Sequence, residues 1–214
     1  MKGVLFTILV TICISINCAA EQMIVIDDFE NGLKLQWKSK KIKGETQYSV
    51  VKTENGHVLK AESSASASAL IYKYKYDPRK YPILTWKWKV ENIIKKGNEM
   101  KKEGDDCAAR VYVIFPSWFP LLTKSINYIW ATKLPKGKYT PSPYSSRSIM
   151  VAVESGSKII GKWVTERRNV YEDFKLLFGK EPPPVGGVAI MTDTDNTGES
   201  AIAYYDDIRI ETLN

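Results

Sequence analysis

The stretch LTWKWKV, residues 84–90, sets the fold class because apolar and polar side chains alternate along it. Every second position from Leu84 to Val90 is apolar, and the positions between them include Lys87 and Lys89. Successive side chains of an extended strand point to opposite faces, so this period of two indicates a strand with one buried face.

The same alternation recurs along much of the chain. It is clear in LIYKYKYD, residues 70–77, and in CAARVYVIF, residues 107–115, where Cys107 and Ala109 would share the core face. Further strands are expected at 23–29, 46–53, 57–63, 125–131, 147–154, 186–193 and 200–211. About ten strands joined by some long connections predict an all-β, two-sheet antiparallel sandwich.

One short helix interrupts this pattern near residues 169–178. Asn169 is a good N-cap, Glu172 occupies the third helical position, and Gly179 supplies the stop. The segments 92–106 and 132–146 are expected to be loops, and loops of this length in a compact domain suit the rim of a binding cleft.

The first residues predict export. Residues 1–20 combine a positive start, a short apolar run and a small-residue end, which is typical of a signal peptide. Residues 21–214 would then form a single β-sandwich domain in the periplasm or outside the cell. The alternative is a lipoprotein attached at Cys18, which would give a peripheral membrane contact. Cleavage leaves Cys107 alone, and we expect a buried, inert thiol there.

Acidic residues gather near the end of the chain and suggest a first metal site. In DTDNTG, residues 193–198, oxygen-bearing Asp193, Asp195 and Thr197 alternate ahead of a glycine, as in the first half of a calcium loop. The bidentate glutamate that completes such a loop is missing, because its position is Tyr204. A plain hairpin turn is the alternative reading.

A second metal site is suggested by Asp206. Simple alternation places Asp206 on the core face with Ile208 and Ile210, and a buried carboxylate is costly unless it is paired or bound to a cation. If the terminal strands are neighbours, Asp28 and Glu30 would join Asp206 around a structural calcium ion. The alternative is that Asp206 caps a loop amide or pairs with a lysine.

Basic and aromatic residues suggest a ligand-binding surface. Arg110 and Tyr112 occupy the non-core positions of their strand near two aspartates and would line a cleft, while Trp118 and Tyr139 fall in turns or loops. The chain is basic, with a formal charge of +7. The candidate binding residues are Lys87, Lys89, Arg110, Tyr112, Trp118 and Tyr139. We expect a monomer that binds a glycan or an anionic envelope component rather than nucleic acid; a solvated lysine face is the alternative.

Catalysis has weaker support. His57 is the only histidine, which excludes a multi-histidine metal site. Carboxylate pairs occur at 105–106 and in the 193–198 segment, but glycoside hydrolysis requires a defined separation between its two carboxyl groups. A carbohydrate-active enzyme with a carboxylate or Tyr/Arg site is therefore the alternative to a binding protein, and a structural envelope protein is a third.

Three stretches together resemble a known bacterial family. They are LTWKWKV at 84–90, GDDCAARVYVIF at 104–115 and GGVAIMTDTDNTGESAIAYYDDIRI at 186–210. The chain is similar here to domain of unknown function 3047, whose members are mostly exported. The resemblance implies a jelly roll like galactose-binding-like domains and carbohydrate-binding modules. In such modules a structural calcium ion often accompanies acidic residues near the chain ends, here DDFE at 27–30 and YYDDI at 204–208.

Overall fold

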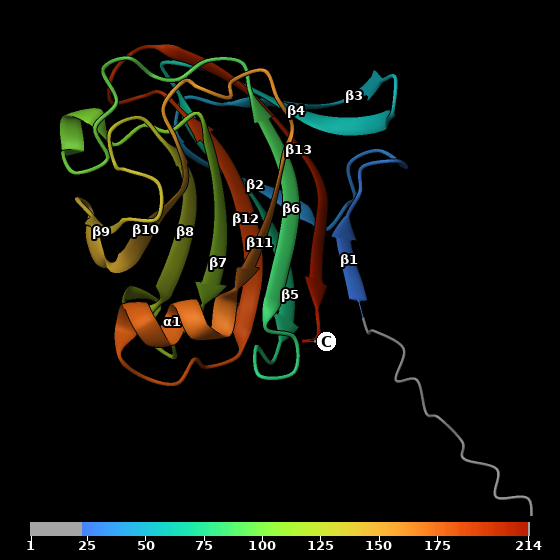
Figure 1. Cartoon of the computed structure of the whole chain (residues 1–214), viewed down its shortest axis with the longest axis vertical. Coiled ribbons are helices and arrows are strands. Elements are labelled where there is room, and N and C mark those ends of the chain that lie inside the picture. Colours follow the sequence, from blue (N-terminus) through green and yellow to red (C-terminus); the bar gives the residue numbers. More distant parts are fainter. Residues whose placement is uncertain (1–22, 214) are drawn as a thin grey trace, which may run out of the picture.

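The alternating strands form two β-sheets that pack on a shared core (Figure 1). The computed structural model describes residues 23–213. Sheet A contains β1 (Met23–Asp27), β3 (Gln47–Thr53), β4 (Gly56–Ser64), β6 (Ile83–Val90), β11 (Val164–Asn169) and β13 (Ser200–Glu211). Sheet B contains β2 (Trp37–Lys43), β5 (Ala67–Tyr76), β7 (Ala109–Phe115), β8 (Lys124–Ala131), β9 (Tyr139–Ser142), β10 (Ser145–Ser155) and β12 (Val185–Asp193).

The strand order brings distant segments together. Sheet A runs β11-β6-β13-β4-β3, with β1 also paired to β13, and sheet B runs β2-β5-β12-β7-β8-β10-β9. The all-β jelly-roll sandwich expected from the sequence is confirmed. Its strand pairs are antiparallel with one exception, because β8 and β10 pair in parallel while β9 pairs with β10 from the outside.

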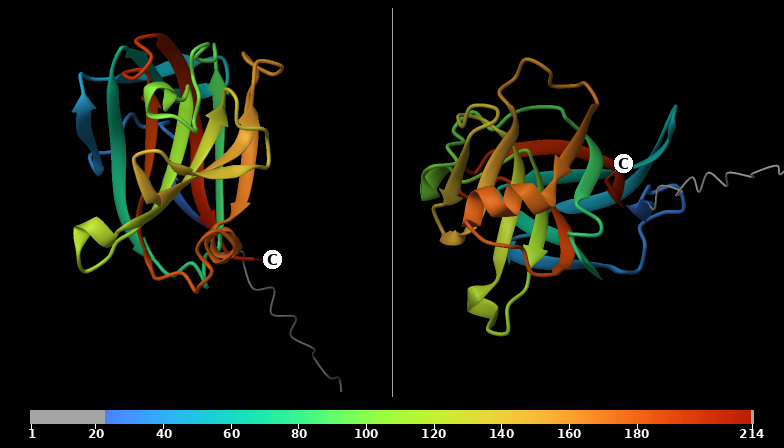
Figure 2. Two further views of the ribbon diagram at one scale, coloured as in Figure 1. Left: turned by 90° about the vertical axis from the view of Figure 1, so that its left-hand side faces the viewer. Right: turned by 60° about the horizontal axis from the view of Figure 1, so that its bottom comes forward.

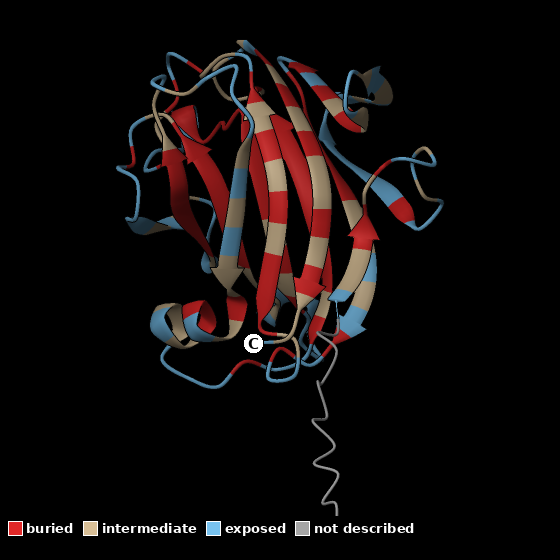
Figure 3. Ribbon diagram, turned by 45° about the vertical axis from the view of Figure 1, so that its right-hand side comes forward, coloured by how far each residue is buried: buried red, intermediate tan, exposed pale blue. Residues whose placement is uncertain are grey.

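Aromatic side chains fill the space between the sheets. Trp86 and Trp88 of β6 point inward as the alternation predicted, and their rings meet edge to face at 5.4 Å. Across the core, Tyr128 stacks on Trp86 at 5.3 Å and Trp130 lies 5.8 Å from Trp88. Figure 3 shows the same alternation as bands of buried and half-buried residues along the strands of sheet A. Burying rings of this size supplies a large part of the apolar stabilisation.

The helix α1 (Val170–Phe178) closes one end of the sandwich. The Asn169 side chain accepts a hydrogen bond from the Glu172 amide at 3.0 Å, and Gly179 ends the helix in the left-handed conformation, so both predicted caps are confirmed. Phe174 is fully buried and lies 4.5 Å from Phe115 at the end of β7. In residues 23–213, no helix combines the length and the apolar character needed to cross a membrane.

Three strands were not expected from the sequence, namely β2, β9 and β11. In β2 only Trp37 is buried, and the residues from Lys38 to Lys43 are exposed. This lysine-rich strand lies at the edge of sheet B, where charged side chains discourage pairing with other molecules. Because its side chains after Trp37 are all exposed, β2 lacks the apolar alternation by which the other strands were recognised.

The two expected loops meet above one end of sheet B. The segment before β7, which includes the 3-10 helix η1 (Lys102–Gly104), and the segment before β9 are joined by Glu99. This fully buried carboxylate accepts hydrogen bonds from the backbone amides of Thr132, Lys133 and Leu134. The sequence placed 132–146 entirely in a loop, whereas β9 and the start of β10 lie within it.

Cys107 is buried, as expected, but on the opposite side of sheet B from the prediction. It packs with Ile129, Met150 and Ala152 outside the central core because β7 begins only at Ala109. Burial raises the pKa of the Cys107 thiol well above its ordinary value, which keeps the thiol protonated. The expected signal peptide and Cys18 lie outside the described residues.

Candidate functional site

The outer face of sheet B contains a pocket of about 320 Å³. Val111 and Val113 face the core, so Arg110 and Tyr112 on the same strand face outward, as the sequence predicted. Neighbouring strands and covering loops complete the pocket. We call it the Arg110 pocket and define it by Arg110, Tyr112, Asn127, Tyr144, Met191 and Asp193.

A buried ion pair anchors the pocket. The Arg110 Nε donates to Oδ1 of Asp193 at 2.6 Å and its Nη2 donates to Oδ2 at 2.9 Å. The same Nη2 donates to the backbone oxygen of Asp105 at 2.8 Å and to its carboxylate at 2.9 Å. The pair therefore joins β7, the end of β12 and the loop before β7. Neither Arg110 nor Asp193 is more than 4% exposed, and bidentate geometry of this kind is the strong form of an ion pair.

Burial determines the direction of the Asp193 pKa shift, whereas the neighbouring carboxylates raise the pKa of Arg110 against the effect of its burial. Burial raises the pKa of Asp193 to about 7, and the Arg110 guanidinium opposes the shift. Both oxygens of Asp193 accept hydrogen bonds, since Oδ1 also accepts from the Cys107 amide at 3.2 Å. Both carboxylate oxygens of Asp193 thus have protein partners, and this arrangement favours a structural role over proton transfer by that carboxylate.

Asn127 is a buried polar residue in the floor of the pocket. It lies on β8 opposite Tyr112 of β7 and beside Met150 of β10, and it is 1% exposed. Its Oδ1 has no hydrogen-bond partner among residues 23–213. Buried polar atoms nearly always have partners, so this unpaired oxygen beside the pocket could accept a hydrogen bond from a ligand hydroxyl.

The rim comes from the two covering loops. Tyr144 is 58% exposed, and its hydroxyl accepts from Nδ2 of Asn196 at 2.7 Å and donates to the backbone oxygen of Lys102 at 3.3 Å. Asp105 of the first loop and Ser142 beside the second also line the pocket. The expectation that segments 92–106 and 132–146 border a cleft is therefore confirmed.

The acidic loop after β12 lies beside the pocket. Asp106, Asp193 and Asp195 can place one carboxylate oxygen each within 4.8 Å of the others, and they are the one such group within the described part of the chain. Asp106 already accepts from the amides of Asn196 and Thr197 at 3.2 and 2.7 Å. These three residues could hold a cation, but two of them already have other partners.

Thr197, the third candidate ligand of the calcium loop suggested by the sequence, makes a local contact in the turn. Its hydroxyl accepts from the Glu199 amide at 3.3 Å, which is a turn contact. The group that does form contains Asp106, a residue that the sequence did not connect with Asp193 and Asp195. Whether calcium binds there stays a prediction.

The expectation that Asp206 faces the core is wrong. Asp207 adopts a left-handed φ of 48°, and the pairing of β13 with β6 shifts register between Asp206 and Arg209. This bulge inserts an extra residue, so Tyr205 and Ile208 face the core while Asp206 points outward and is only half-buried. Burial and the neighbouring Asp207 raise the pKa of Asp206 to about 6.

The terminal strands are neighbours, as expected, but Asp28, Glu30 and Asp206 do not form a carboxylate group of the kind described above. The pairing of β1 with β13 is irregular at Asp27, and that residue, not Asp28, is the buried one. Asp27 receives hydrogen bonds from the Trp37 indole and the Phe29 amide at 2.8 and 3.0 Å. Glu30 is exposed and instead contacts His57 at 3.2 Å.

The six predicted binding residues do not form one surface. Arg110 and Tyr112 meet in the pocket, but the two lysines, Lys87 and Lys89, lie on sheet A beside a hollow of about 480 Å³ that Asp206 also lines. Lys87 pairs with Asp207 at 2.5 Å, and Lys89 pairs with Glu91 at 2.8 Å and lies over the Tyr204 ring.

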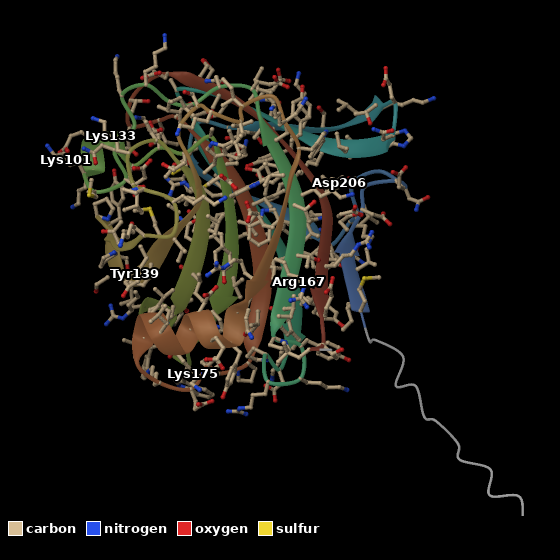
Figure 4. All side chains as sticks on the ribbon, viewed as in Figure 1. Lys101, Lys133, Tyr139, Arg167, Lys175 and Asp206 are labelled. Carbon is tan, nitrogen blue, oxygen red and sulfur yellow. The ribbon has the colours of Figure 1, made fainter. Side chains whose placement is uncertain are left out.

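The remaining two aromatic residues, Tyr139 and Trp118, lie elsewhere in the fold. Tyr139 is on the edge strand β9, and Figure 4 shows it on the opposite side of the molecule from Asp206. Trp118 is in the connection between β7 and β8, at the far end of β7 from Arg110.

Sequence reasoning missed Asn127, Tyr144 and Met191 as pocket residues. Asn127 did give a signal, because it is a polar residue within the apolar run INYIWA of an expected strand. Tyr144 and Met191 gave none, since only the pairing of β7 with β12 and the folding of the loops bring them beside Arg110.

Solved structures with a similar fold include two sugar-binding modules. The family 30 carbohydrate-binding module of a cellulosomal cellulase of Clostridium thermocellum superposes with a TM-score of 0.54 at 10% identity, covering 90% of this chain and 99% of that one. The family 11 module from the same organism, in complex with a beta-1,3-1,4-mixed-linked tetrasaccharide, gives a TM-score of 0.44 at 14% identity over 89% and 94% of the two chains.

At such low identity, the first of these likenesses establishes the sandwich fold and nothing about a ligand. No curated protein matches the chain. The model of the family described as protein of unknown function, DUF3047, matches residues 35–209, so the chain belongs to that family.

Proposed function

We propose that the protein binds an uncharged glycan in the Arg110 pocket. The observation that carries the proposal is the buried Oδ1 of Asn127, an unpartnered acceptor in the floor of the pocket. A sugar hydroxyl would donate to this atom and remove the cost of leaving it unpaired. The similarity of the fold to a carbohydrate-binding module is consistent with such a ligand.

The other lining groups suit a sugar ring. Tyr112 and Tyr144 offer aromatic surface, while Ser142 and Ser148 offer hydroxyl groups. A pocket that combines apolar surface with a few fixed polar groups is the usual form of a small-ligand site.

The charges favour a neutral sugar over an acidic one. The positive charge of Arg110 is matched by Asp193 and Asp105, and Asp195 adds a further carboxylate to the lining. No other cationic side chain lines the pocket within residues 23–213. The carboxylate of an acidic sugar would therefore lie near the carboxylates of the pocket with no unpaired cation to balance it. A neutral sugar would instead donate hydrogen bonds from its hydroxyl groups to those carboxylates. We also propose that the protein is exported, because residues 1–20 have the pattern of a signal peptide.

The test is a binding screen against neutral and acidic polysaccharides by affinity electrophoresis, followed by calorimetry on the best ligand. Asn127→Leu should weaken binding about tenfold or more, because the ligand hydroxyl then loses its acceptor. It should also leave the protein equally stable or more stable, since an unpaired buried oxygen is replaced by apolar surface.

The matched control is Asn31→Leu, which changes an exposed asparagine that does not line the pocket. It should bind as the wild type does. Preference for acidic polysaccharides, or unchanged affinity of a folded Asn127→Leu protein, would refute the proposal.

A further inference from the structure

The connection between β7 and β8 exposes four large apolar side chains. Trp118 is 93% exposed, Phe119 64%, Leu121 87% and Leu122 45%. We call these four residues the apolar tip. Single exposed apolar residues are ordinary, but a group at the end of one connection marks an interaction site.

The tip is a shaped protrusion. The 3-10 helix η2 (Pro120–Leu122) gives it a turn, and hydrogen bonds run from the Leu122 amide to Phe119 at 2.8 Å and from the Thr123 amide to Pro120 at 3.1 Å. Figure 2 shows this segment, in yellow-green, standing out from the rest of the fold. A protruding apolar tip offers no groove for a partner's side chain, so its shape suits insertion into an apolar environment.

Cationic side chains surround the base of the tip. Lys124, Lys180 and Arg79 line a hollow of about 360 Å³ together with Leu122 and Glu181, and Glu181 is paired with Lys175 at 3.8 Å. Neither Lys124 nor Lys180 has a carboxylate within ion-pair distance in the part of the chain that the structure describes. Lys124 instead lies 4.3 Å from the centre of the Phe178 ring. Burial, the neighbouring Lys180 and the exposed Arg147 together lower the pKa of Lys124.

We propose that the apolar tip and the lysines at its base dock the protein on an anionic phospholipid surface. The tip residues enter the boundary between headgroups and acyl chains, and Lys124 and Lys180 contact the lipid phosphates. A lipid surface matches both observations, since it is the partner that places dense negative charge directly above an apolar interior.

The rest of this end of the molecule suits the same orientation. Helix α1 packs against the end of β7, and its Leu176 is 67% exposed there. The Arg110 pocket begins at the other end of β7, which has seven residues and is therefore roughly 20 Å long. A protein docked through the tip keeps this pocket away from the lipid. The docking proposal stands independently of what the pocket binds.

The experiment is co-sedimentation of the full chain with phosphatidylcholine vesicles that contain or lack phosphatidylglycerol. Leu121→Ser should weaken binding about tenfold, because a leucine that would be buried in the membrane is lost. Leu35→Ser is the matched control, since Leu35 is also 87% exposed but lies in the connection between β1 and β2. It should bind as the wild type does. All variants share residues 1–22, so any contribution of that segment cancels.

A charge variant and a depth measurement complete the test. Lys180→Ala should weaken binding to phosphatidylglycerol vesicles about fivefold and leave binding to pure phosphatidylcholine unchanged. Brominated lipids should quench tryptophan fluorescence less in Trp118→Phe than in the wild type.

Equal binding by Leu121→Ser and Leu35→Ser, or binding that is indifferent to phosphatidylglycerol, would overturn the proposal. A dimer in gel filtration that Leu121→Ser dissociates would also overturn it, because a second copy of the chain would then cover the tip.

Discussion

Replacing Arg110 by methionine tests whether the buried ion pair holds the pocket together. Methionine keeps much of the side-chain length but removes the guanidinium. Asp193 then loses donors at 2.6 and 2.9 Å and retains the Cys107 amide at 3.2 Å. Asp105 loses its two contacts with Nη2 as well. The variant therefore leaves a buried carboxylate without its counter-charge.

The expected loss of stability is large. Removing one partner of a buried ion pair costs about 3–5 kcal/mol, because the remaining charge stays away from water. For a domain of this size, each kcal/mol corresponds to about 2–4 °C in melting temperature, so Arg110→Met should melt roughly 10 °C below the wild type.

The loss should depend on pH in a defined direction. The pKa of Asp193 is raised from 3.8 to about 7 in the folded protein. The protonated carboxyl therefore stabilises the folded state fully when the pH is below the unfolded-state pKa, and this stabilisation is lost as the pH rises through about 7. Arg110 lowers the pKa of Asp193, so this pKa is higher in Arg110→Met. The stability of the variant therefore continues to fall up to a higher pH than that of the wild type. The difference between Arg110→Met and the wild type should therefore be smaller at pH 5 than at pH 8.

Urea unfolding followed by tryptophan fluorescence at these two pH values provides the measurement. The double variant Arg110→Met with Asp193→Asn should recover about half of the loss at pH 8, because the unpaired charge is gone. A loss below about 1 kcal/mol at pH 8 is what a surface pair gives, and it would refute the argument. So would a loss that is equal at both pH values.

Three further predictions concern the bulge, the packing of sheet B and the cation. The pKa of Asp206 is raised to about 6 in the folded protein, so the stability contributed by its protonated form is lost as the pH rises from about 4 through 6. In urea unfolding, Asp206→Asn should therefore be more stable than the wild type by about 1 kcal/mol at pH 8 and equally stable at pH 4. The figure of about 1 kcal/mol is reduced because Asp206 is partly exposed. Gly187→Ala should cost about 3 kcal/mol in the same assay, because a Cβ would lie 2.4 Å from the backbone oxygen of Tyr72; a change within about 0.5 kcal/mol would contradict this close packing. Any rise in melting temperature caused by calcium should disappear in Asp195→Asn and persist in Asp206→Asn. The reverse result would mean that calcium binds beside the terminal strands.

Most of the fold could be predicted from local sequence patterns. Alternation identified the inward faces of β5, β6 and β7, because the period of two follows from strand geometry alone. The helix ends were equally local, since Asn169 and Gly179 act on groups within a few residues. Alternation failed at Asp206, where one extra residue in the bulge reversed the facing of the residues before it.

The sequence by itself determined most of the strands, the helix and the outward direction of Arg110 and Tyr112, because each depends on neighbours along the chain. Only the tertiary structure decided that Arg110 pairs with Asp193, 83 residues away, and that Asn127 lies in the floor of the same pocket. It also separated Lys87 and Lys89 from that pocket by placing them on the other sheet. These relations depend on strand order and register, which are set by the packing of whole sheets rather than by any short run of residues.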